Sequence, residues 1–121
     1  MGLKVLTVDD SRVMREILLM ALTQAGFDVV QAEDGQHGLD VLPGAEPDVI
    51  ITDINMPRMD GFGFIEGVRR TDRYRGTPIL VLSTEFDAAK KTRAREAGAT
   101  GWIVKPFDAE KLVAAVNRVA A

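Results

Sequence analysis

The stretch VIITDINMP, residues 49–57, decides the fold because a run of four apolar or β-branched residues ends directly in an acidic residue, Asp53. Similar short runs, rich in Val, Ile or Leu, recur along the chain, and most of them lack a clean polar alternation. Strands that are covered on both faces of a parallel sheet have this pattern. We therefore predict five strands, at Lys4–Val8, Asp28–Ala32, Val49–Thr52, Ile79–Ser83 and Trp102–Val104.

Helical patterns with recognisable ends alternate with these strands. Asp87 and Asp108 stand where a helix needs a side chain to cap its first N–H groups. Pro43 and Gly44 predict that a short second helix ends at Leu42. The predicted helices are Ser11–Ala25, Gly35–Leu42, Asp60–Arg70, Asp87–Ala97 and a last one that begins after Asp108.

This alternation predicts an α/β protein of the (βα)5 type, a doubly wound parallel five-stranded sheet with helices on both faces and right-handed crossovers. A length of 121 residues fits one domain, and no repeat or linker interrupts it. We therefore expect a single domain over residues 1–121, without an output domain.

Composition excludes several classes of protein. The chain has no cysteine, which excludes disulfides and thiolate metal sites, and its one histidine, His37, excludes a multi-histidine site. A net charge of −3 argues against a nucleic-acid partner that binds through bulk charge. No apolar run approaches the roughly 18 residues of a membrane span, and no signal peptide is recognisable. We expect a cytoplasmic monomer with neither nucleic acid nor membrane as a partner.

Polar side chains follow the predicted strands at their carboxyl ends, where sites of open α/β sheets lie. These residues are Asp9 and Asp10 after the first strand, Asp53 after the third, Ser83 at the end of the fourth, and Lys105 with Pro106 after the fifth. Two carboxylates about 4 Å apart repel by about 4 kcal/mol at an effective dielectric of about 20. A hard divalent cation such as Mg²⁺ removes that cost and prefers such ligands. A metal, an ammonium and a hydroxyl together predict a cradle for a phosphoryl group, which a carboxylate attacks.

Four separated segments resemble the receiver domains of two-component response regulators. They are VDDS at 8–11, TDINMPRMDGFGFI at 52–65, LVLSTE at 80–85 and GATGWIVKPF at 98–107. The resemblance covers essentially the whole chain and is greatest to the single-domain chemotaxis regulators of the CheY type. It implies the flavodoxin-like strand order 2-1-3-4-5.

The resemblance also implies roles for individual residues. Asp53 would be the phosphoacceptor, and Lys105 would pair with the phosphoryl group. Mg²⁺ would be held by Asp10, by Asp53 and by the main-chain carbonyl of Asn55, with Asp9 acting through water.

Further positions match the family's switch and tuning residues. Ser83 would swing toward the phosphoryl oxygen, and Trp102 would be the aromatic switch residue, where the family more often has Tyr or Phe. Asn55 and Glu85 would tune the lifetime of the phosphoryl group. The peptide bond that leads into Pro106 would be cis.

The implied function is a phosphorylation-dependent signalling switch. A sensor histidine kinase of the CheA type would phosphorylate Asp53, and a target would dock on the fourth helix, fifth strand and fifth helix. The implied setting is chemotaxis, where the domain would act at the flagellar motor switch or as a phosphate sink. The chain would not be an enzyme beyond its own phosphotransfer and autodephosphorylation.

Other functions stay open at this point. The first alternative is a stand-alone receiver in a phosphorelay outside chemotaxis. A Mg²⁺-dependent phosphatase with an aspartyl nucleophile is less favoured, because Asn55 stands where that class needs a second acid. A flavodoxin-like cofactor binder is disfavoured because three carboxylates would repel the cofactor's phosphate. The complete set of acids and lysine argues against a docking scaffold that is never phosphorylated.

Overall fold

The computed structural model describes residues 2–84 and 87–121, and its centre is a five-stranded sheet. The spatial order is β2-β1-β3-β4-β5, and all neighbouring strands run parallel. This confirms the doubly wound fold and the strand order that the resemblance implies. The strands are β1 (Lys4–Val8), β2 (Asp28–Ala32), β3 (Val49–Thr52), β4 (Ile79–Ser83) and β5 (Gly101–Val104), so only β5 departs from prediction, by beginning one residue earlier.

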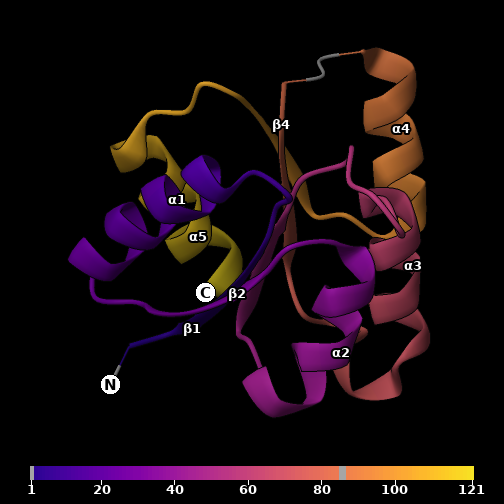
Figure 1. Ribbon diagram of the computed structural model, residues 1–121, viewed down its shortest axis with the longest axis horizontal. Helices are drawn as coiled ribbons and strands as arrows, with labels where there is room; N and C mark the ends of the chain where they lie inside the picture. The colour runs from indigo at the N-terminus through magenta and orange to yellow at the C-terminus, as the bar shows by residue number, and fades with distance from the viewer. Residues whose placement is uncertain (1, 85–86) are drawn as a thin grey trace.

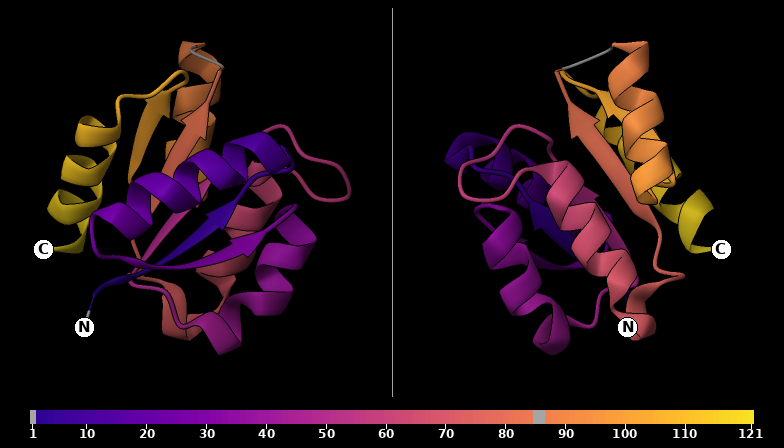
Figure 2. Two further views of the ribbon diagram at one scale, coloured as in Figure 1. Left: turned by 60° about the vertical axis from the view of Figure 1, so that its left-hand side comes forward. Right: turned by 90° about the vertical axis from the view of Figure 1, so that its right-hand side faces the viewer.

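Helices cover both faces of the sheet. They are α1 (Arg12–Gln24), α2 (Gly35–Ala45), α3 (Gly61–Arg70), α4 (Ala88–Ala97) and α5 (Ala109–Ala120), with a short 3₁₀ turn, η1 (Asp72–Tyr74), after α3. Figure 1 shows α1 and α5 on one side of the sheet and α2, α3 and α4 on the other, and Figure 2 shows the same layers from two other directions. No helix in the described ranges is long and apolar enough to cross a membrane.

Side chains cap the five α-helices at their first turns, as the sequence predicts for the helices that follow Asp87 and Asp108. The capping residues that accept main-chain N–H bonds are Ser11, Asp34, Asp60, Asp87 and Asp108. Each satisfies donors that have no partner within the helix. The caps fix where every helix leaves its preceding loop, and these loops carry the polar residues at the strand ends.

The second helix is longer than predicted, since it continues through Pro43 to Ala45. Pro43 lies in the last turn and is exposed, so its ring disturbs only one intrahelical bond. Leu42 and Ala45 are buried in the same turn, and Glu46 then ends the helix with a left-handed φ of 44°. Burial of this turn outweighs the local preference of Pro43 to end the helix.

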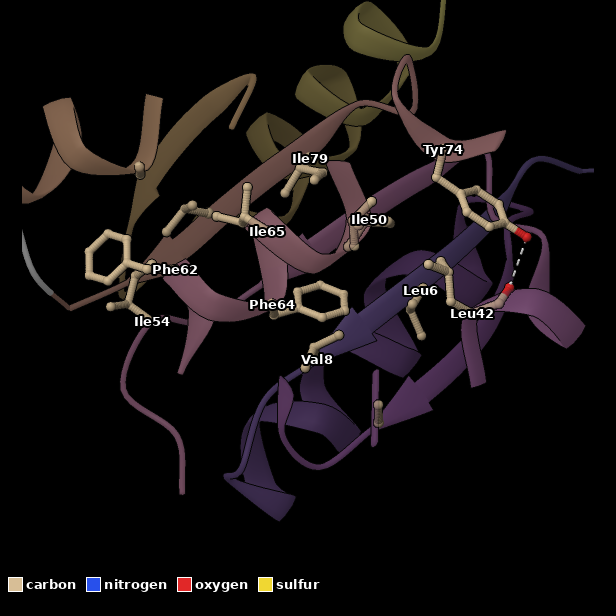
Figure 3. Close-up of a cluster of buried hydrophobic side chains, with 14 residues drawn as sticks. Leu6, Val8, Leu42, Ile50, Ile54, Phe62, Phe64, Ile65, Tyr74 and Ile79 are labelled. Carbon is tan, nitrogen blue, oxygen red and sulfur yellow. Dashed lines mark hydrogen bonds between the residues drawn. The ribbon is translucent and has the colours of Figure 1, made fainter. Parts of the chain in front are cut away.

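The core lies in two layers because successive strand residues point to opposite faces. In β1 and β3, Leu6 and Ile50 face one layer while Val5 and Val49 face the other, and all four are at most 1% exposed. Figure 3 shows the layer beneath α2 and α3, where Phe64 packs among residues of the central strands. This arrangement explains the continuous apolar runs, since both sides of each central strand are covered.

Candidate functional site

The predicted acidic residues lie together because main-chain pairing continues beyond the strand ends. Asp53 N donates to Val8 O at 2.9 Å, and Asp9 N donates to Ala32 O at 3.1 Å. The first bond places the residue after β3 beside the end of β1, and the second places the residue after β1 beside the end of β2. Carboxylate oxygens of Asp9, Asp10 and Asp53 all lie within 4.8 Å of one another. The predicted convergence of three acids at one edge of the sheet is therefore confirmed.

Lys105 reaches this cluster from the end of β5. Its Nζ lies 2.9 Å from Asp9 Oδ2 and 2.9 Å from Asp53 Oδ2, and its side chain is only 10% exposed. Lys105 N donates to Ser83 O at 2.8 Å, which extends the β4–β5 ladder by one residue. The peptide bond from Lys105 to Pro106 is cis, as the resemblance implies. One ammonium thus bridges two carboxylates from different strands.

Main-chain donors orient both bridged carboxylates. Asp53 Oδ1 accepts the N–H of Ile54 at 2.6 Å, and Asp9 Oδ1 accepts the N–H of Ser11 at 2.9 Å. Arg15, one turn into α1, donates from Nη1 to the main-chain oxygen of Asp9 at 2.8 Å. Each of the two carboxylates therefore has one oxygen held by its own loop and the other held by Lys105.

Burial and pairing shift two pKa values at the site. Burial raises the pKa of Asp9 above its ordinary value, although the bonds from Ser11 and Lys105 act in the opposite direction. Burial alone would lower the pKa of Lys105, but its bonds to Asp9 and Asp53 outweigh that effect and raise it. Lys105 therefore holds its proton more firmly than an ordinary lysine. Asp9 lies beside it, and the ionised form of this buried carboxyl needs further positive charge nearby.

The donor set fits a hard divalent cation. Three carboxylates offer oxygen ligands from a common point, and Asp10 is exposed, so water can complete the shell. Lys105 neutralises only part of the cluster. A cation that prefers oxygen ligands would neutralise the rest of its negative charge.

Residues 5–117 match the family described as the response regulator receiver domain. The chain belongs to this family. It is 38% identical over 118 residues to a probable chemotaxis protein CheY of Rhizobium etli, covering 97% of this chain and 92% of that protein. It is also 33% identical over 116 residues to the protein PilG of Pseudomonas aeruginosa, covering 96% and 86% of the two chains.

Among solved structures, the receiver domain superimposes on the chemotaxis protein CheY4 of Vibrio cholerae with a TM-score of 0.94. The two are 45% identical, and the match covers 98% of this chain and 99% of the other. These findings confirm the predicted class of function, a signalling switch of the CheY-like type that works through phosphorylation.

The structure describes three further predicted positions of the receiver domain, Ser83, Asn55 and Trp102. Ser83 is fully buried at the end of β4, where it pairs with Val104, and Asn55 is exposed two residues after Asp53. Trp102 is half-buried on β5 and packs against the core layer beneath α3 and α4. Glu85 lies outside the described residues.

Two arginines near the receiver site have no signal in the sequence. Arg15 holds the Asp9 carbonyl, and Arg58 pairs with Asp34, which is 24 residues away. Arg15 lies outside the four segments that resemble the family, and Arg58 lies within the second of them, but neither residue type marks a contact that depends on how loops meet in space. The sequence does carry a signal for Asp34, because Asp is a common N-cap and it stands directly before the helix that begins at Gly35.

Proposed function

We propose that this receiver domain accepts a phosphoryl group on Asp53 from a sensor histidine kinase in a Mg²⁺-dependent reaction, and that it then changes its affinity for a target protein. The observation that carries the proposal is the setting of Asp53. Its carboxylate lies 2.9 Å from the Lys105 ammonium and within 4.8 Å of two further carboxylates. No packing requirement brings three acids and a lysine to one point.

The chemistry is an in-line transfer to a carboxylate. An oxygen of Asp53 attacks phosphorus and forms an acyl phosphate, while the bond from phosphorus to the donor nitrogen breaks and its electron pair stays on that nitrogen. Lys105 already contacts Asp53 Oδ2, so its ammonium is placed to neutralise charge on the transferred group. The fixed bond from Ile54 N holds the carboxylate in one orientation.

Mg²⁺ would be held by Asp10, Asp53 and the main-chain carbonyl of Asn55, with Asp9 acting through water. When bound, it would neutralise the developing charge on the phosphoryl oxygens. Asp9 would supply its charge from the buried side of the cluster, since it is only 1% exposed.

The signal would leave the site along β4 and β5. Ser83 would turn its hydroxyl toward the phosphoryl group and so change the space beside β4, and Trp102 would respond as the aromatic switch residue. Trp102 lies directly across the ladder from Val81, two residues before Ser83. A target that prefers one of the two arrangements shifts the population toward it.

The target would dock on α4, β5 and α5. Hollows lie on both sides of Trp102, one lined by Lys91 and Arg95 of α4 and the other by Lys111 and Arg118 of α5. Asp108 also lines the second hollow, so the two rims together hold four basic side chains and one acidic one, a balance that suits an acidic amphipathic segment. This surface supports docking of a partner better than a purely solvated face.

The setting that we propose is chemotaxis, with a CheA-like kinase as donor and the flagellar motor switch as target, or with the domain as a phosphate sink. The likeness to CheY proteins supports this setting. A stand-alone receiver in another phosphorelay is the second candidate. We further propose that the protein is a cytoplasmic monomer with one domain. It would have no enzymatic activity beyond its own phosphotransfer and autodephosphorylation. Asn55 and Glu85 would tune the lifetime of the acyl phosphate.

Intact-mass measurement tests the proposal. Incubation with acetyl phosphate and MgCl₂ should add one phosphoryl group to the parent protein, and EDTA should prevent the addition. The Asp53→Asn variant should not be labelled, whereas Asp28→Asn, which changes an exposed residue at the opposite end of the sheet, should behave as the parent does. Equal labelling of Asp53→Asn would disprove the assignment of the acceptor.

A further inference from the structure

An ion pair joins the two loops that flank the acidic site on the α2 and α3 side. Asp34, between β2 and α2, is 4% exposed, and its Oδ2 accepts a bond from Arg58 Nε at 2.7 Å and lies 2.6 Å from Nη2. Arg58 belongs to loop 53–60, which connects β3 to α3. Gly35 N also donates to Met59 O at 3.1 Å. Two consecutive residues of loop 53–60 are therefore tied to the neighbouring loop.

The contact is made at a conformational cost. Arg58 has a φ of 64°, in the left-handed region that residues with a side chain seldom adopt. At Gly35, an added Cβ would lie 2.6 Å from Met59 O, so the close approach of the loops requires glycine there. An exposed arginine can bond to water from a relaxed backbone. Strain accepted to reach one buried carboxylate indicates that the shape of loop 53–60 matters.

Loop 53–60 also carries two of the groups that would hold Mg²⁺, the Asp53 carboxylate and the Asn55 carbonyl. It begins at Asp53, whose Oδ1 accepts the N–H of Ile54, and it closes on itself through Gly61 N, which donates to Ile54 O at 2.8 Å. The carbonyl of Asn55 follows in the same turn. A displacement of this loop moves the Asp53 carboxylate and the Asn55 carbonyl together.

We propose that Arg58 and Asp34 are positioning residues whose ion pair holds loop 53–60 in the shape that presents Asp53 and Asn55 to Mg²⁺. The proposal deepens the function proposed above and rests on it. The main-chain N–H of His37, which donates to Asp34 at 2.8 Å, and then Arg58 hold the pKa of Asp34 below its ordinary value although burial opposes them. Asp34 is therefore a carboxylate at neutral pH.

Asparagine variants remove the ion pair with little other change. Asn tolerates the left-handed backbone at position 58, so Arg58→Asn removes the guanidinium without adding strain. Asp34→Asn keeps an oxygen that caps α2 by accepting from His37 N. Arg75→Asn is the matched control, because Arg75 also pairs with an aspartate, Asp72, but both of these side chains are largely exposed.

Calorimetric titration with MgCl₂ on the folded proteins gives the deciding measurement. We expect Arg58→Asn and Asp34→Asn each to weaken Mg²⁺ binding by about tenfold, the low end of what losing an outer-sphere partner costs. The double variant should be no weaker than either single variant, because both remove the same contact. The Arg75→Asn control should bind as the parent does.

The sign of the Arg58→Asn effect separates positioning from simple electrostatics. Removal of a positive charge near a cation site should strengthen Mg²⁺ binding if the charge acts only through its field. Stronger or unchanged binding by Arg58→Asn would therefore overturn the proposal. Unchanged binding with a lower melting temperature would overturn it as well, by showing a role in stability alone.

Rescue provides a second readout. Both guanidinium nitrogens converge on the single oxygen Oδ2, so a point charge can replace them. Arg58→Lys should therefore regain most of the parent's Mg²⁺ affinity and most of its labelling rate with acetyl phosphate. No rescue would count against the ion pair. Failure of the parent itself to be labelled would instead contradict the proposed function, while the effect on Mg²⁺ binding would still test the role of the Arg58–Asp34 ion pair.

Discussion

Replacement of Asp10 by Asn should make the metal-free protein more stable and the Mg²⁺-loaded protein less stable than the parent. Carboxylate oxygens of Asp10, Asp9 and Asp53 lie within 4.8 Å of one another. Like charges at that separation repel by about 0.9 kcal/mol in water and by about 3.5 kcal/mol at an effective dielectric of about 20. Asp10 is exposed, so the value in water applies to it.

Lys105 reduces this repulsion but does not remove it. Its ammonium lies 2.9 Å from Asp9 and 2.9 Å from Asp53, so it offsets about one of the two repulsions that Asp10 experiences. A net gain of about 1 kcal/mol is therefore expected for Asp10→Asn without metal, or about 4 °C in melting temperature for a domain of this size.

Mg²⁺ should reverse that order. At a free Mg²⁺ concentration of about 100 times its dissociation constant, binding stabilises the parent by about 2.7 kcal/mol. If the loss of Asp10 weakens binding about a hundredfold, the variant gains only about 0.4 kcal/mol at the same concentration. The parent should then be the more stable protein by about 1.3 kcal/mol.

Urea denaturation followed by far-ultraviolet circular dichroism, in EDTA and in MgCl₂, measures both differences. Asp28→Asn removes the same charge at the opposite end of the sheet. For this variant, the difference between the urea curves in EDTA and in MgCl₂ should equal that of the parent. A large loss of stability of Asp10→Asn in EDTA would show that Asp10 is structural. An undiminished Mg²⁺ increment would show that Asp10 is not a ligand.

Thr7, Lys105 and Trp102 each provide a separate test. Thr7 Oγ1 is buried with no partner among the described residues, so Thr7→Val should raise the free energy of unfolding by about 1 kcal/mol in urea titrations, and a loss would reveal a hidden partner. The pKa of Lys105 is raised in the folded protein, so the charged lysine stabilises the fold fully below its unfolded-state pKa, and this stabilisation is lost as pH rises through the folded-state pKa. The urea midpoint should therefore fall more between pH 9 and 12 for the parent than for Lys105→Met. Equal falls in the two proteins would refute this. A phosphoryl analogue with Mg²⁺ should change Trp102 fluorescence, and Ser83→Ala should reduce that change; an equal signal in both proteins would disconnect the hydroxyl from the aromatic ring.

The sheet and the acidic cluster could be predicted because both correspond to short patterns of consecutive residues in the sequence. Strands buried on both faces require unbroken apolar runs, and the two core layers on either side of β1 and β3 explain those runs. Parallel strands place their carboxyl ends at one edge, so residues that follow the runs, such as Asp9 and Asp53, had to meet. Local pattern plus topology was sufficient for the positions of these side chains.

Contacts between loops could not be predicted in the same way. The pairing of Arg58 with Asp34 depends on a positive φ and on the close approach at Gly35, and neither feature has a periodic signature. The extension of α2 past Pro43 was missed for a related reason, since burial of the last turn overrides a local rule. The contact of His37 has no signature either, since its Nδ1 accepts the N–H of Glu33 at 3.1 Å across the start of α2.

The distribution of burial indicates which half of the site can move. Asp9 and Asp53 follow central strands whose residues are almost wholly buried, whereas no residue of the edge strand β5 is fully buried and α4 buries only Ala94. Elements with little buried surface open at low free energy. To change the ratio of two conformations from 1:99 to 99:1, one of them must be stabilised relative to the other by about 5.5 kcal/mol. A charge-assisted hydrogen bond contributes about 1.5–3 kcal/mol. Under the proposed function, new charge at Asp53 would act through Lys105 on this weakly packed edge, and a few such bonds would be enough to shift β5 and α4 while the central strands stay in place.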